Sequence, residues 1–188
     1  VNLNDKILIG KKLIKLENKI KLWKIYKPPK VICSNKDLNN RKTIFDILPN
    51  KFPRVISVGR LDFMSEGLLL LTNNGDFSRK LEIPSSNILR VYRLCIKGSV
   101  KSYMTRKINS GISINGIHYK KITAQIEKFQ DPYTWLIFKL KEGKNREIRN
   151  ICKFYKWNVV KLIRIQYGTI KLLKLKSGEI REVKNFSI

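Results

Sequence analysis

Strand-length segments separated by turn residues fill most of the chain from residue 89 onward, and this pattern constrains the fold most strongly. Residues 89–98 alternate apolar and polar side chains, and residues 112–119 contain an Asn-Gly pair typical of a type I′ hairpin. Residues 120–129 and 133–141 indicate two further strands with a short turn between them. Strands joined so closely pair antiparallel. We therefore predict an α+β fold whose mainly antiparallel mixed sheet is flanked by helices and loops.

The first half of the chain predicts fewer regular elements. Residues 54–61 alternate as a strand does, and residues 67–72 form an apolar run between turn residues, which indicates a buried strand. We expect short helices over residues 41–49 and 77–82, the second with Asp76 as its N-cap.

Residues 145–155 change the hydrophobic period to that of a helix. Their apolar side chains recur at the spacing of one helical face, and Arg146, Arg149 and Lys153 form a basic stripe beside it. Two interpretations are open for this stripe. It is either a solvated surface, or a phosphate-binding surface with one arginine turned inward toward an acid.

The charge balance is strongly basic. The 188 residues include 40 Lys and Arg but only 14 Asp and Glu, which gives a net charge of +26. An AT-rich genome would explain much of the lysine but not the scarcity of acids. The partner expected for such a surface is nucleic acid or an anionic membrane. The longest aliphatic run, residues 68–71, is too short to span a bilayer, and nothing resembles a DNA-binding helix-turn-helix. We therefore predict an RNA partner, with no membrane and no DNA.

Several chemistries are excluded by what the sequence lacks. The single histidine, His118, and the scattered Cys33, Cys95 and Cys152 form no metal-ligand pattern and no disulfide framework. The sequence contains no phosphate-cradling glycine loop, and one histidine cannot serve a Ser/His/Asp set. We expect no metal and no cofactor. Unpaired cysteines of this kind indicate a reducing, cytoplasmic compartment.

The polar loop before the buried strand is the main candidate for chemistry. Asp62 directly follows a predicted strand, and Arg60, Ser65 and Glu66 share its short loop. Asp62 either closes a turn, a common role of aspartate, or acts as a reactive acid on a rigid mount. Tyr92 is open to two interpretations as well, as strand packing or as a flat surface for a nucleobase.

Taken together, these stretches resemble the bacterial ribosomal pseudouridine synthases of the Rsu type. Residues 59–76, GRLDFMSEGLLLLTNNGD, are similar to the first signature of that family, and residues 142–152, EGKNREIRNIC, to a later one. Residues 22–37, LWKIYKPPKVICSNKD, resemble the entry into the catalytic domain. The resemblance runs from about residue 21 to the end and is closest to the large-subunit branch, with the small-subunit branch left open.

The resemblance implies a pseudouridine synthase catalytic fold that isomerises one uridine in ribosomal RNA, most readily 23S, without a cofactor. It implies that Asp62 is the catalytic aspartate, that Tyr92 stacks on the target base, and that Arg149 pairs with Asp62. The residues expected to contact the substrate are Arg60, Arg90, Lys144, Asn145 and Arg146. Two positions depart from many relatives, Arg90 where they have lysine and Asn74 where they have aspartate.

The resemblance also suggests two parts of the chain. Residues 1–20 are expected to be the remnant of an S4-like RNA-binding module and its linker, and residues 21–188 the catalytic domain of a monomer. The competing hypothesis is a non-catalytic basic protein that binds ribosomal RNA or assists ribosome assembly. Such a protein would share the charge but would have no need of an acid on a rigid loop.

Overall fold

The computed structural model describes residues 7–10, 12–14, 19–35, 37 and 39–186. Near the N-terminus, β1 (Ile7–Ile9) and β2 (Lys12–Ile14) pair antiparallel. The other residues of the expected S4-like remnant, 1–6, 11 and 15–18, lie outside the described residues.

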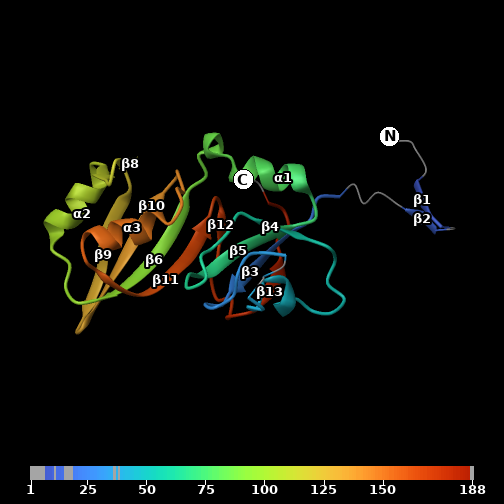
Figure 1. Cartoon of the computed structure of the whole chain (residues 1–188), viewed down its shortest axis with the longest axis horizontal. Coiled ribbons are helices and arrows are strands. Elements are labelled where there is room, and N and C mark those ends of the chain that lie inside the picture. Colours follow the sequence, from blue (N-terminus) through green and yellow to red (C-terminus); the bar gives the residue numbers. More distant parts are fainter. Residues whose placement is uncertain (1–6, 11, 15–18, 36, 38, 187–188) are drawn as a thin grey trace.

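One nine-stranded sheet organises the rest of the described chain (Figure 1). Its main order is β13-β3-β5-β11-β6-β10-β9, with β4 beside β5 and β12 beside β11. All its strand pairs are antiparallel except β5 with β11, so the predicted mixed sheet is confirmed. The strands are β3 (Leu22–Lys27), β4 (Ile56–Val58), β5 (Glu66–Thr72), β6 (Arg90–Lys97), β9 (Thr123–Gln130), β10 (Tyr133–Leu140), β11 (Asn158–Tyr167), β12 (Ile170–Lys171) and β13 (Ile180–Glu182).

The remaining elements surround this sheet. The helices are α1 (Gly75–Glu82), α2 (Ser102–Asn109) and α3 (Glu147–Phe154), the 3-10 turns are η1 (Phe45–Ile47) and η2 (Pro84–Ser86), and a hairpin joins β7 (Ile112–Ile114) to β8 (Ile117–Tyr119). Apolar residues of α2 and α3 pack with inward-facing residues of β6, β9, β10 and β11 in one core cluster. Two further clusters lie on β3 and β5, on opposite sides of the sheet.

Three local predictions differ from the structure. Asn74, not Asp76, caps α1, because its side chain accepts a hydrogen bond of 2.8 Å from the Phe77 backbone N–H. The helix expected over 41–49 is only the turn η1, and the strand expected over 54–61 is only β4. The sequence pattern also missed α2, whose buried residues are only Thr105 and Ile108.

The centre of the sheet depends on one close approach. Gly67 on β5 is the Cα partner of Arg164 on β11, in the one parallel pair of the described strands. It adopts a φ of +100°, and a Cβ built there would stand 2.4 Å from the Arg164 carbonyl oxygen. Only glycine allows the two strands to come this close.

This junction places three polar side chains in one row across the sheet. Lys27 on β3 pairs with Gly67, Gly67 with Arg164, and Arg164 with Tyr92 on β6. Residues that are partners across neighbouring strands share a face of the sheet. Lys27, Arg164 and Tyr92 therefore lie on one face of the sheet.

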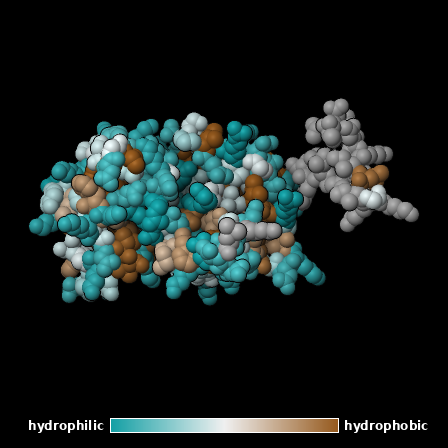
Figure 2. Space-filling model, viewed as in Figure 1, coloured by the Kyte–Doolittle hydropathy of each residue, from teal (hydrophilic) through white to brown (hydrophobic). Residues whose placement is uncertain are grey.

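The surface is predominantly hydrophilic in the view of Figure 2, with scattered apolar side chains. Within the part of the chain that the structure describes, no helix combines the length and apolar character needed to cross a membrane.

Candidate active site

The loop between β4 and β5 answers the question that Asp62 raises. Asp62 does close a turn, but with its backbone, because its carbonyl oxygen accepts a hydrogen bond of 3.0 Å from the Ser65 N–H. Its carboxylate is left for other contacts, and the side chain is 29% exposed. The turn therefore fixes the backbone while the acid faces a cavity.

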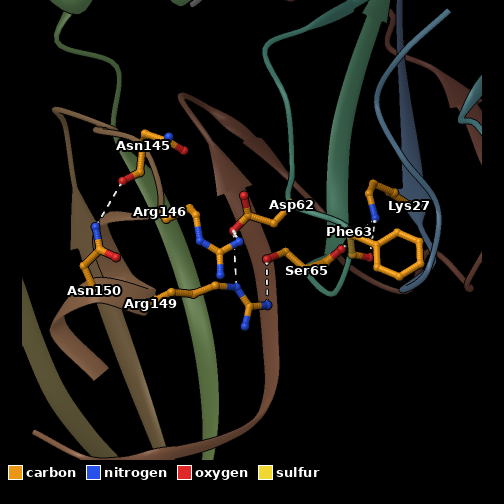
Figure 3. A network of polar contacts seen from close by, with 8 residues as sticks. All are labelled: Lys27, Asp62, Phe63, Ser65, Asn145, Arg146, Arg149 and Asn150. Atoms are coloured by element: carbon orange, nitrogen blue, oxygen red, sulfur yellow. Dashed lines mark hydrogen bonds and ion pairs between the residues drawn. The ribbon is translucent and has the colours of Figure 1, made fainter. Parts of the chain in front are cut away.

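Two arginines from the other side of the cavity approach this carboxylate (Figure 3). Arg149 on α3 donates from Nε to Asp62 Oδ2 at 3.2 Å and from Nη2 to Ser65 Oγ at 3.1 Å. Arg146 is more exposed, and its Nη1 lies 3.7 Å from the same Oδ2. The contact that the sequence predicts between Arg149 and Asp62 is therefore present, and it aims the carboxylate from one side.

Lys27 on β3 binds the backbone of the same loop. The sequence analysis did not select this residue. Its side chain is fully buried, and Nζ donates to the carbonyl oxygens of Pro28 and Ser65, both at 2.8 Å, and more weakly to that of Phe63 at 3.5 Å. Removal from water lowers the pKa of this ammonium group to about 8. The sequence did contain a signal for Lys27, because this lysine ends an apolar strand and directly precedes two prolines.

The loop from residue 141 to 146 forms the facing wall. Lys144 Nζ lies 3.0 Å from Glu142 Oε1 and donates to the His118 carbonyl oxygen at 2.5 Å. The Lys144 backbone N–H donates to Glu147, whose carboxylate is buried so that its pKa is raised. Asn145 is exposed, and its carbonyl oxygen accepts from the Asn150 side chain at 3.4 Å.

Arg90 lies deeper than a surface contact with substrate requires. Its guanidinium is buried and donates to the carbonyl oxygens of Lys141, at 2.8 Å, and Ile88, at 3.3 Å. It also donates to the Tyr167 hydroxyl at 3.3 Å. These bonds anchor the start of β6 to the facing wall, and the expected contact of Arg90 with substrate stays a prediction.

A single cavity of about 780 Å³ brings the predicted residues together. Ser65 of the Asp62 loop and Arg164, which the sequence analysis did not select, also line it. All eight predicted site residues line the same cavity: Arg60, Asp62, Arg90, Tyr92, Lys144, Asn145, Arg146 and Arg149. Tyr92 is half-buried and packs against two core clusters. Its rigid ring and the acid of Asp62 thus face one space that can admit a flat, polar ligand.

Comparisons with known proteins agree with this arrangement. The family described as RNA pseudouridylate synthase matches residues 21–154. An RNA pseudouridine synthase of Rickettsia conorii is 44% identical over 186 residues, which cover 98% of this chain and 80% of the relative. The chain belongs to the RNA pseudouridine synthase family. Members of this family are isomerases that act on RNA.

Two further comparisons refine the family assignment. The ribosomal large subunit pseudouridine synthase B of Buchnera aphidicola (Schizaphis graminum) is 38% identical over 180 residues, covering 92% of this chain and 70% of the relative. A crystal structure of a pseudouridylate synthase superposes with a TM-score of 0.78 at 24% identity, covering 98% of this chain and 79% of that one. The predicted family and fold are therefore confirmed.

Proposed function

We propose that this chain converts one uridine of large-subunit ribosomal RNA to pseudouridine, with Asp62 as the catalytic residue. The observation that carries the proposal is the mounting of Asp62, an acid held between Arg149 and the Lys27-bound loop at the edge of a cavity shared with Tyr92. The names of the Buchnera relatives support the large subunit as the source of the RNA.

The reaction breaks the N1–C1′ bond of the uridine, turns the base, and forms a C5–C1′ bond. Atoms and electrons balance within the nucleotide, so the isomerisation requires no redox partner. Asp62 would attack C1′ or C6, or remove the proton from C2′, and these three routes stay open. Arg149 orients the carboxylate for any of them.

The surrounding residues have distinct proposed roles. The target base must leave its stack, which costs a few kcal/mol, and stacking on Tyr92 would offset part of this cost. Arg60, Arg90, Lys144, Asn145 and Arg146 line the cavity and would contact the RNA. Residues 21–188 would form the catalytic domain of a cytoplasmic monomer, and residues 1–20 would belong to an S4-like module.

The test is pseudouridine formation in unmodified ribosomal RNA. Large-subunit and small-subunit RNA are incubated separately with the unmutated chain, with Asp62→Asn, and with Asp76→Asn as a control at an exposed acid. Carbodiimide adducts are then mapped by primer extension. We expect one new stop in large-subunit RNA with the unmutated chain and the control, and none with Asp62→Asn, which should still bind RNA.

The other outcomes separate the hypotheses. A stop that persists with Asp62→Asn would remove Asp62 from the mechanism, and a stop in small-subunit RNA alone would reassign the substrate. Salt-sensitive binding of the unmutated chain without any stop would favour the non-catalytic RNA-binding protein.

A further inference from the structure

Arg164 is a buried arginine beside the catalytic cavity that the proposed function does not use. It lies on β11, which runs between β5 and β6 (Figure 1), and it lines the cavity. Its side chain is 2% exposed, and Nε donates to the Leu68 carbonyl oxygen at 2.7 Å. This bond ties β11 to β5 and gives one nitrogen of the guanidinium a structural role.

The other end of the guanidinium has no such role. Nη2 is buried, and no residue that the structure describes offers it an acceptor. No carboxylate among the described residues forms an ion pair with Arg164. A buried charged donor without an acceptor is destabilising, so its retention calls for a ligand.

A second cation, Arg90, lies beside Arg164. The carboxylates of Asp62 and Glu66 act on the neighbouring Lys27 and, within the described part of the chain, form no ion pair with Arg164. The guanidinium carbons of Arg164 and Arg90 lie 5.1 Å and 5.0 Å from the centre of the same Tyr167 ring. The charge of Arg164 also acts unfavourably on the ammonium group of Lys27, the next polar side chain of the row. A ligand that completes this site must therefore present an oxygen carrying negative or partly negative charge.

The position of Arg164 beside Tyr92 indicates which oxygen that is. The two residues are Cα partners on antiparallel strands, and side chains of such partners lie about 5 Å apart at their Cβ atoms. A base stacked on the Tyr92 ring would turn its edge toward Arg164. The edge of uracil carries two carbonyl oxygens, O2 and O4.

We propose that the Arg164 guanidinium, through the end that does not bind Leu68, donates a hydrogen bond to one of these carbonyl oxygens of the target uracil; the inference rests on the proposed function and adds a residue to it. When the N1–C1′ bond breaks, the detached base carries negative charge that is shared by these oxygens. A charged donor fixed beside them stabilises the detached base more than the intact nucleotide. If the acceptor is O4, the contact also selects uracil over cytosine, which has an amino group at that position.

The experiment combines a change in the protein with a change in one atom of the substrate. A short RNA is made around the uridine mapped above, with uridine, 2-thiouridine or 4-thiouridine at the target position, since sulfur accepts hydrogen bonds weakly. Single-turnover rates are measured for the unmutated chain, Arg164→Met and Arg164→Lys. The control is Arg93→Met, whose guanidinium lies over Trp135 and pairs with Glu127 at 2.7 Å.

We expect one of the two thio substitutions to slow the unmutated chain and Arg93→Met by about tenfold or more. In Arg164→Met the uridine rate should already be reduced by a similar factor, and the same thio substitution should add less than about a threefold loss. Arg164→Lys retains one ammonium group, which can donate to the Leu68 carbonyl oxygen or to the base but not to both. The factor by which the thio substitution slows this variant should therefore also be smaller than for the unmutated chain. RNA binding by all variants should stay within about threefold of the unmutated chain.

If the thio substitution slows both Arg164 variants by the same factor as the unmutated chain, the inference is overturned. Arg164 would then only link β11 to β5. Unmutated protein that is insensitive to both thio substitutions would overturn it as well, even if Arg164→Met fails to fold. Failure of the proposed function is recognised separately, because the unmutated chain would then form no pseudouridine in the uridine RNA.

Discussion

The two loops that face each other across the cavity are held in different ways. The loop that carries Asp62 is fixed through its backbone, with the carbonyl oxygens of Phe63 and Ser65 bound to buried Lys27 and that of Phe63 also to the Lys30 N–H. The facing loop, residues 141–146, is instead held at its two ends, where buried Arg90 binds the Lys141 carbonyl oxygen and buried Glu147 accepts from the Lys144 N–H. Its middle carries the partly exposed pair of Lys144 with Glu142, and Gly143 and Arg146 have left-handed backbone. Asp62 and the exposed Arg60 lie on the wall that buried Lys27 binds, and the exposed Lys144 and Arg146 lie on the facing wall.

The contact between the two walls should show the largest effect of mutation. Arg149→Met removes both the bond to Asp62 and the bond to Ser65. We expect the single-turnover rate to fall by about 100-fold or more, because the acid loses its orientation, with RNA binding within about threefold. Rates and dissociation constants are measured on the same RNA.

Arg146→Met provides the matched comparison. Its guanidinium is more exposed and lies 3.7 Å from Asp62, so its loss should slow turnover by less than about tenfold. Equal losses in the two variants would show that general positive charge, rather than the bond from Arg149, supports Asp62.

Mutation of the buried Lys27 should have an intermediate effect on turnover, together with an effect on stability that depends on pH. Lys27→Met leaves the carbonyl oxygens of Pro28 and Ser65 without their donor, which should reduce both stability and turnover. Burial lowers the pKa of Lys27 from 10.5 to about 8, so between these pH values the unfolded chain binds more protons than the folded one. The unmutated chain should therefore gain stability relative to Lys27→Met as pH rises from about 8 to about 10.5, by roughly 3 kcal/mol.

Urea unfolding of both proteins at pH 7 and pH 10 measures this difference. All other titrating groups are common to the two proteins. The change with pH in the difference between their free energies of unfolding therefore reports on Lys27. If the stability of the unmutated chain relative to Lys27→Met stays constant or decreases toward pH 10, the result would contradict the burial of a protonated amine at this position.

Mutation of Lys144, in the facing loop of residues 141–146, should show the smallest effect. Lys144→Ala removes an exposed ammonium that already pairs with Glu142, so we expect RNA affinity to fall by only about threefold. If Lys144 also contacts a phosphate, the slope of log affinity against log salt should decrease by nearly one. Lys80→Ala, at an exposed lysine of α1, is the control and should change neither quantity.

Much of this site could be predicted because its residues lie in contiguous stretches of sequence. The stretch around Asp62 and the spacing of Arg146 and Arg149 predicted an acid and a basic stripe on adjacent elements, although Arg146 precedes α3 and has left-handed backbone. The inward arginine is confirmed, and phosphate binding by the stripe stays a prediction. Arg149 turns inward to the acid, whereas Lys153 on the same helix is exposed.

The remainder depends on sheet order, which a single sequence does not display. Lys27, Arg164 and Tyr92 are far apart in the chain and become neighbours only because β11 enters between β5 and β6. The cap of α1 was misplaced by two residues because Asn74 and Asp76 are both good capping residues and only backbone geometry separates them.

The central place of β11 also has a consequence for how each molecule is made. β5 and β6 leave the ribosome well before β11, and 70 residues separate the end of β6 at Lys97 from the end of β11 at Tyr167. At 5–20 residues per second, translation of that interval takes about 4 to 14 s. During this time β6 and the Glu66–Gly67 end of β5 each present an unpaired edge of the kind that recruits other strands. The enzyme therefore depends during its synthesis on the quick arrival of one late strand, which closes both edges and completes the cavity in the same step.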